Sequence, residues 1–118
     1  MTRTRLFHPA KFAGRLLAVR PLSYFQDPTH GDCLRSDIAT DDDVHRDLVV
    51  RSGGLVNQWY TWIGAGPVVG VLGQTGSGYS TPWTLHPTPE RDRPDVEKLL
   101  SLDHVRQWLE PQPEEAPF

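Results

Sequence analysis

The first three quarters of this chain consist largely of short apolar runs. Each run is ended within a few residues by glycine, proline or aspartate. With 10 glycines and 11 prolines among 118 residues, the chain has little room for long helices. Five runs have the length and the β-branched or alternating composition of strands. We therefore expect an all-β domain, a small barrel or sandwich, with strands over residues 14–20, 34–40, 47–51, 68–72 and 83–85.

The segments between and after these runs carry their own signals. The run Asp41–Asp43 predicts a turn between the second and third strands, because aspartate is poor in strands and frequent in turns. Residues 55–63 fit either a strand or a short helix. From residue 94 to residue 109 the apolar positions recur at helical spacing, and Ser101 and Asp103 divide this segment into two short helices.

The chain predicts one domain over residues 1–110 and a flexible acidic tail over residues 111–118, which are rich in proline and glutamate. Its single cysteine, Cys33, excludes an internal disulfide and suits a reducing compartment. No stretch reads as a signal peptide or as a membrane span. We expect a cytoplasmic protein that has no membrane partner.

The formal net charge of −3 conceals a strong segregation along the chain. Residues 1–25 carry five basic side chains and no acid, whereas residues 26–50 carry a net charge of −5. Residues 51–88 hold Arg51 as their one formal charge, and residues 89–118 carry −4. The acidic balance argues against a simple basic nucleic-acid binder, but the first 25 residues can supply one basic face.

Two apparent catalytic motifs do not hold. Residues 73–81 match a phosphate-binding loop, but Tyr79 stands where the lysine belongs, and Pro82 follows where a helix should begin. We interpret this stretch as a flexible loop between two strands. His30, Asp32 and Cys33 lie close together, yet nothing beside them resembles an oxyanion site or a metal-ligand spacing. We expect no catalytic residue, metal or cofactor, and a small enzyme at these three residues stays an alternative.

The aromatic residues carry more information, because many stand in a stretch without formal charge. Trp59, Tyr60 and Trp62 lie there together, Tyr79 follows in the glycine-rich loop, and Tyr24 lies beyond the first strand. Proteins that hold single-stranded nucleic acid combine aromatic rings, which stack on bases, with arginine or lysine along the phosphates. The chain offers both ingredients.

Several short motifs along the chain form a recognisable series. They are Gly14-Arg15-Leu16-Leu17 with Pro21-Leu22, Arg35-Ser36-Asp37-Ile38, Asp47-Leu48-Val49-Val50, Val69-Gly70-Val71-Leu72-Gly73-Gln74, Pro82-Trp83-Thr84-Leu85 and Thr88-Pro89. Together they resemble the small single-stranded DNA-binding proteins of actinobacterial phages and prophages. That resemblance implies an OB-fold, a five-stranded Greek-key barrel whose face binds oligonucleotides. It also implies a role in phage DNA replication or recombination with low sequence specificity.

The last residues give a separate resemblance. Glu114, Glu115, Pro117 and Phe118 are similar to the tip of bacterial single-stranded DNA-binding proteins. A terminal carboxylate and a phenylalanine ring can dock together in a basic, apolar pocket. The tail would thus recruit replication or recombination proteins.

These expectations define a candidate site for single-stranded DNA. The phosphate contacts are expected from Lys11, Arg15, Arg20 and Arg51, and the stacking rings from Trp59, Tyr60, Trp62 and Tyr79. We also expect a homo-oligomer, since one small barrel covers only about 4–16 nucleotides. The alternative is a protein-interaction or virion-assembly module without nucleic-acid binding.

Overall fold

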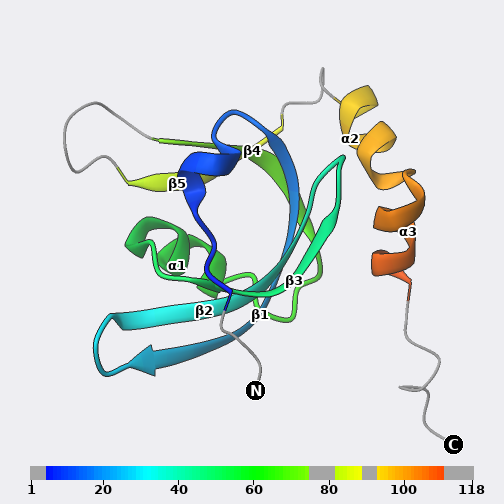
Figure 1. Cartoon of the computed structure of the whole chain (residues 1–118). Helices are drawn as coiled ribbons and strands as arrows, with labels where there is room; N and C mark the ends of the chain where they lie inside the picture. The colour runs from blue at the N-terminus through cyan, green and yellow to red at the C-terminus, as the bar shows by residue number, and fades with distance from the viewer. Residues whose placement is uncertain (1–4, 75–81, 89–92, 111–118) are drawn as a thin grey trace, which may run out of the picture.

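The computed structural model describes residues 5–74, 82–88 and 93–110 (Figure 1). Its elements are the 3-10 helix η1 (Pro9–Phe12), the strands β1 (Leu16–Asp27), β2 (Gly31–Ala39), β3 (Val44–Val50), β4 (Val68–Gln74) and β5 (Trp83–Pro87), and the helices α1 (Gly53–Tyr60), α2 (Arg93–Leu100) and α3 (Asp103–Leu109). The prediction of a β-dominated domain with a short helical segment after its last strand is confirmed.

The five strands form one antiparallel sheet in the order β3-β2-β1-β4-β5. The first three strands follow one another as hairpins, and α1 then carries the chain to β4 on the far side of β1. A fourth strand that returns to lie beside the first is the Greek-key order that the resemblance implied.

The sheet curls around the core (Figure 1), but the expected barrel is not closed. Within the described ranges β3 and β5 do not pair, because other parts of the chain occupy their edges. Leu6 forms a parallel bridge to Val49, and the Phe7 amide donates to the Val49 carbonyl at 2.9 Å. On the opposite edge the side chain of Gln58 hydrogen-bonds the backbone of Leu85.

The inner side of the curled sheet holds the main core. Alternation along β1 sends Leu17 and Val19 inward, and α1 covers them with Leu55 and Trp59, which lie four residues apart on one helix face. The other buried members are Phe7, Leu34, Ile38, Leu48, Val50, Val56, Leu72 and Leu85.

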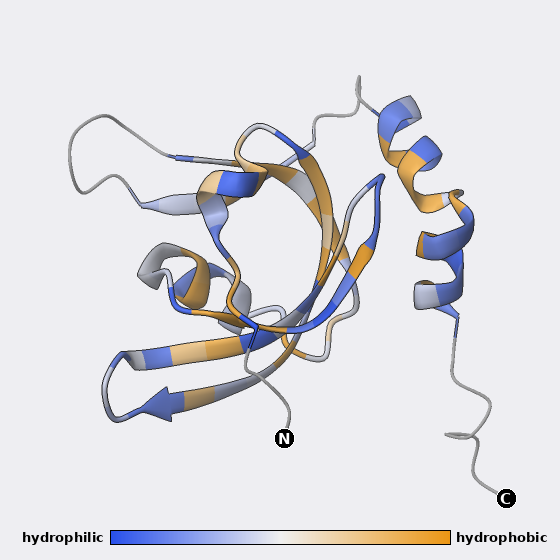
Figure 2. Cartoon of the chain, in the orientation of Figure 1, coloured by the Kyte–Doolittle hydropathy of each residue, from blue (hydrophilic) through white to orange (hydrophobic). Residues whose placement is uncertain are grey.

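The outer side of the sheet carries a second core under α2 and α3. The small side chains of Ala18 and Ala39 lie beneath Leu99, Val105 and Trp108 of the two helices. Figure 2 shows the hydrophobic side of both helices facing the sheet and the hydrophilic side facing away. The C-terminal helices therefore cover part of the outer face that an OB-fold can otherwise offer to a ligand.

The connecting segments settle the remaining expectations. The turn at Asp41–Asp43 is confirmed, and the Thr40 hydroxyl accepts hydrogen bonds from the amides of Asp42 and Asp43. The segment that fitted a strand or a helix forms α1, and a break at Ser101 and Leu102 separates α2 from α3 as predicted. No helix in the described part of the chain has the length and apolar character needed to span a membrane.

Candidate nucleic-acid interface

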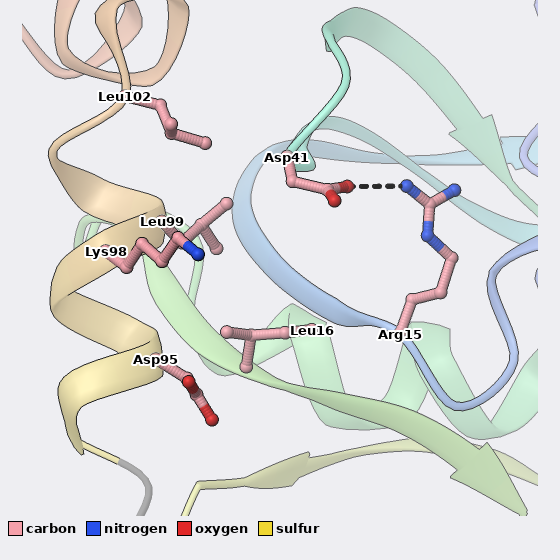
Figure 3. Close-up of a pocket in the computed structure, with 7 residues that line it drawn as sticks. All are labelled: Arg15, Leu16, Asp41, Asp95, Lys98, Leu99 and Leu102. Atoms are coloured by element: carbon pink, nitrogen blue, oxygen red, sulfur yellow. Dashed lines mark hydrogen bonds and ion pairs between the residues drawn. The ribbon is translucent and has the colours of Figure 1, made fainter.

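Arg15 lies at the start of β1, where two carboxylates neutralise it. Its Nη2 atom is 2.9 Å from Asp41 and 3.0 Å from Asp42, both in the β2–β3 turn. Figure 3 shows Arg15 and Asp41 beside a pocket between β1 and α2, which Leu16 and Leu99 also line. The volume of this pocket is about 370 Å³. The charge of Arg15 is thus already partnered inside the domain, and its contact with a phosphate stays a prediction.

Arg20 is engaged on the outer face of β1. Its guanidinium lies 4.5 Å from the centre of the Trp108 ring, donates to the Trp108 carbonyl at 3.1 Å and lies 3.4 Å from Asp37. Asp37 is only 5% exposed and also accepts from Trp108 Nε1 at 3.0 Å. Arg20 thus helps hold α3 against the sheet, and its expected role as a phosphate ligand stays a prediction.

The other two predicted cations are accessible. Lys11 is exposed on η1, and its ammonium group has no ion pair within the described residues. Arg51 is exposed at the end of β3, where its Nη1 lies 3.2 Å from Nε2 of His30 in the β1–β2 turn. Of the four predicted cations, two therefore have carboxylate partners and two have none among the described residues.

Trp59 is fully buried, so it cannot stack on a base while the domain is folded. It lies on the inner face of α1, with its ring centre 5.9 Å from that of Phe7. Its Nε1 lacks a hydrogen-bond partner within the described residues. Trp62 is half-buried and packs against the same core. Helical spacing, rather than strand alternation, decided the direction of Trp59.

Among the predicted stacking residues that the structure describes, Tyr60 is the one classed as exposed. It is 55% exposed on α1, and its ring makes an edge contact with Tyr24, whose ring centre lies 5.4 Å away and which is 40% exposed. Tyr24 reaches α1 because it pairs with Leu34 of β2, a member of the inner core, and so points to the same side of the sheet. Tyr24 was not among the expected site residues.

The two tyrosines open onto a pocket of about 270 Å³ that Asp32, Val56 and Asn57 also line. The Tyr24 hydroxyl donates to Oδ1 of Asp32 at 2.6 Å, and Gln26 Nε2 lies 3.1 Å from the same oxygen. These two hydrogen bonds lower the pKa of the Asp32 carboxyl, while the bond to Asp32 raises the pKa of Tyr24. At neutral pH the pocket therefore holds one carboxylate and a neutral phenol.

The opposite side of the β1–β2 hairpin carries a further aromatic and cationic pair. The Arg35 guanidinium lies 5.5 Å from the centre of the Phe25 ring and 3.1 Å from Asp47. Cys33 is buried beside them, and burial raises the pKa of its thiol. A raised pKa keeps the thiol protonated and unreactive, which argues against Cys33 as a nucleophile.

The remaining expected site residues lie outside the described part of the chain. They are Tyr79 of the glycine-rich loop and Glu114, Glu115, Pro117 and Phe118 of the tail. Within the described residues no group of three or more histidine, cysteine, aspartate or glutamate side chains is placed to hold a metal ion.

The geometry also brings together residues that the sequence did not group. Tyr24 and Tyr60 meet at the end of the β1–β2 hairpin, and Arg51 lies beside the turn of that hairpin. Comparison of the chain with protein-family models, with curated proteins and with solved structures gives no match.

Proposed function

We propose that the chain binds single-stranded DNA at the end of the β1–β2 hairpin, between the hairpin and α1. The observation that carries the proposal is the contact between Tyr24 and Tyr60, two accessible rings from separate elements beside one pocket. Stacking of a base on such a ring contributes about 1–3 kcal/mol and tolerates any sequence. The Greek-key order of the sheet supports the proposal, because OB-folds present ligands to the strands and loops of this region.

The charges near the hairpin support a weak electrostatic contribution. Arg51 has no carboxylate partner among the described residues and lies at the turn, where it can meet a phosphate. Arg35 is already paired with Asp47, and Asp27 and Asp32 add negative charge. We therefore expect a shallow salt dependence, with a slope of about −0.7 to −1.4 for one or two phosphates neutralised.

The same proposal includes a role in phage DNA replication or recombination within the bacterial host cytoplasm. It rests on the resemblance of the strand motifs and of the residues Glu114, Glu115, Pro117 and Phe118, through which the tail would recruit partner proteins. Several copies would cover a long single strand, because one site of this size spans few nucleotides.

One observation favours a second candidate, a protein-interaction or virion-assembly module. Arg15 and Arg20, two of the predicted phosphate contacts, already have carboxylate partners inside the domain. A module of this kind would not respond to an oligonucleotide, so one binding experiment separates the two functions.

The test is a fluorescence-anisotropy titration of a labelled dT oligonucleotide of about 12 nucleotides with the full chain. We expect Tyr60→Ala to weaken binding at least about fivefold and Tyr60→Phe to preserve it, because phenylalanine keeps the ring. Arg51→Gln should weaken binding and make the salt slope about 0.7 shallower, whereas Arg106→Gln, an exposed change on α3, should not. Absence of binding, or equal binding by Tyr60→Ala, would contradict the proposal.

A further inference from the structure

The Tyr24–Tyr60 pocket contains a carboxylate with unused hydrogen-bonding capacity. Oδ1 of Asp32 accepts from the Tyr24 hydroxyl and from Gln26 Nε2, and no described residue donates to Oδ2. The two donors fix the orientation of the carboxyl group at the pocket. An ionised carboxylate accepts hydrogen bonds and cannot donate them, so this group favours a ligand that presents donors.

The four DNA bases differ in the donors that their pairing edges present. Guanine offers two adjacent donors, its ring N1–H and its exocyclic amino group. Adenine and cytosine each offer one amino group beside a ring nitrogen that accepts. Thymine offers one ring N–H between two carbonyl oxygens, which a carboxylate repels. A charged acceptor at the end of the pocket therefore ranks guanine first and thymine last.

The rest of the pocket fits one base. Its volume of about 270 Å³ falls near the lower end of the usual range for small-molecule sites, about 300–1,000 Å³. Val56 is buried and gives an apolar surface, while Asn57 is exposed on α1 and can donate its amide to a base carbonyl. The tyrosines supply ring faces and edges for stacking.

We infer that this pocket selects guanine within single-stranded DNA, with Asp32 as the specificity-determining residue. The inference rests on the proposed function and refines it, since low overall sequence specificity becomes a preference at one base position. The low pKa that its hydrogen bonds give Asp32 keeps the acceptor charged at neutral pH.

The experiment uses the unmodified full chain and four labelled oligonucleotides of about 12 nucleotides. Each is a dT tract with two central positions replaced by dG, dA or dC, or left as dT. We expect the dG oligonucleotide to bind about five to ten times more tightly than the dT tract, a modest value for a base contact at an exposed site. Replacing dG with deoxyinosine, which lacks the exocyclic amino group, should remove most of this preference.

A variant pair then assigns the preference to its residue. Asp32→Asn should bring the affinity ratio between the dG and dT oligonucleotides close to one, because the amide presents a donor beside an acceptor. Asp95→Asn removes one exposed carboxylate from α2 and should keep the ratio. Circular dichroism verifies that both variants are folded.

The outcomes separate the inference from the function on which it rests. Equal affinity for all four oligonucleotides, or a preference that survives in folded Asp32→Asn, overturns guanine selection and leaves single-strand binding in place. Failure of every oligonucleotide to bind overturns both. The inosine comparison needs no variant, so it tests guanine selection even if Asp32→Asn does not fold.

Discussion

Gln58 and Leu85 are joined by two hydrogen bonds, in which the side-chain amide of Gln58 replaces the backbone of a neighbouring strand. Gln58 Nε2 donates to the Leu85 carbonyl at 2.9 Å, and the Leu85 amide donates to Gln58 Oε1 at 2.8 Å. The pair occupies the free edge of β5, where a neighbouring strand would otherwise pair. Since unpaired sheet edges invite association with other chains, Gln58 protects the edge of β5 by satisfying the backbone groups of Leu85.

Replacing Gln58 with leucine should therefore destabilise the domain. Both backbone groups of Leu85, a residue only 1% exposed, would lose their partners, at an expected cost of about 1–3 kcal/mol. Urea denaturation measures the free energy of unfolding. Asn57→Ala, an exposed change on the same helix, should cost far less. Equal unfolding curves for Gln58→Leu and the parent chain would show that the two bonds contribute nothing.

Gly53 and Gly54 give a matched pair of substitutions at the start of α1. A Cβ atom on Gly54 would come within 2.5 Å of the Trp83 carbonyl oxygen, whereas one on Gly53 would meet no atom within 4 Å. Gly54→Ala should lower the free energy of unfolding by about 1–3 kcal/mol through overpacking. Gly53→Ala should be neutral or stabilising by up to about 1 kcal/mol, because alanine favours the helix. Thermal unfolding followed by circular dichroism compares them, and the reverse order would contradict the close approach of α1 to β5.

Trp108 and Asp37 provide a test of how α3 is held. Trp108→Phe keeps an aromatic ring but removes the 3.0 Å bond from Nε1 to the buried carboxylate. We expect a loss of about 1–3 kcal/mol and faster amide hydrogen exchange in α3. Gln107→Ala, exposed on the same helix, is the control. Unchanged exchange in Trp108→Phe would mean that apolar contact alone holds the helix.

The Tyr24–Asp32 bond should be visible in alkaline titration. The pKa of Tyr24 lies above its ordinary 10.0 in the folded chain, chiefly because its hydroxyl donates to Asp32. The stability that this adds is complete below pH 10.0 and is lost as the pH rises through the raised value. Asp32→Asn should shift the Tyr24 phenolate absorbance to lower pH. Superimposable titrations of the two chains would argue against this bond in solution.

At acidic pH the dependence of stability on pH has the opposite sign, because the pKa values of two aspartates are lowered. The pKa of Asp32 is lowered by its bonds from Tyr24 and Gln26, and the pKa of Asp27 is lowered chiefly by the amide of Thr29. Their contribution is complete above the ordinary value of 3.8 and is lost as the pH falls through the lowered values. We expect the hairpin amides to exchange faster at about pH 3 than the pH dependence of unstructured amides explains.

The strands could be predicted because their signals are local. The apolar run over residues 14–20 and the aspartates of the turn at Asp41–Asp43 mark the first part of β1 and the β2–β3 connection, although β1 continues past Pro21 to Asp27. The helical pair at the end of the domain followed in the same way from apolar spacing. Each of these assignments needs only the nearest neighbours of a residue.

The candidate site could not be predicted as well, because it depends on contacts between distant residues. The sequence presents Arg20 as an available cation, because Trp108, which packs against it in the fold, lies 88 residues further along the chain. Trp59 faces inward because its segment is a helix, a choice that composition left open. Tyr24 and Tyr60 meet only through the fold. Gln58 likewise gives no sequence signal of its bonds to Leu85.

The helical pair α2–α3 also limits the path that a bound polymer can take. With Trp108 seated over Arg20 and Asp37, the outer surface of β1 and β2 next to the hairpin is screened by protein. On the proposed function, a single strand held at the tyrosine pocket would not extend over this covered outer surface. Each molecule would then contact only a short segment of DNA, and the size of the domain would set the spacing between molecules bound along one strand.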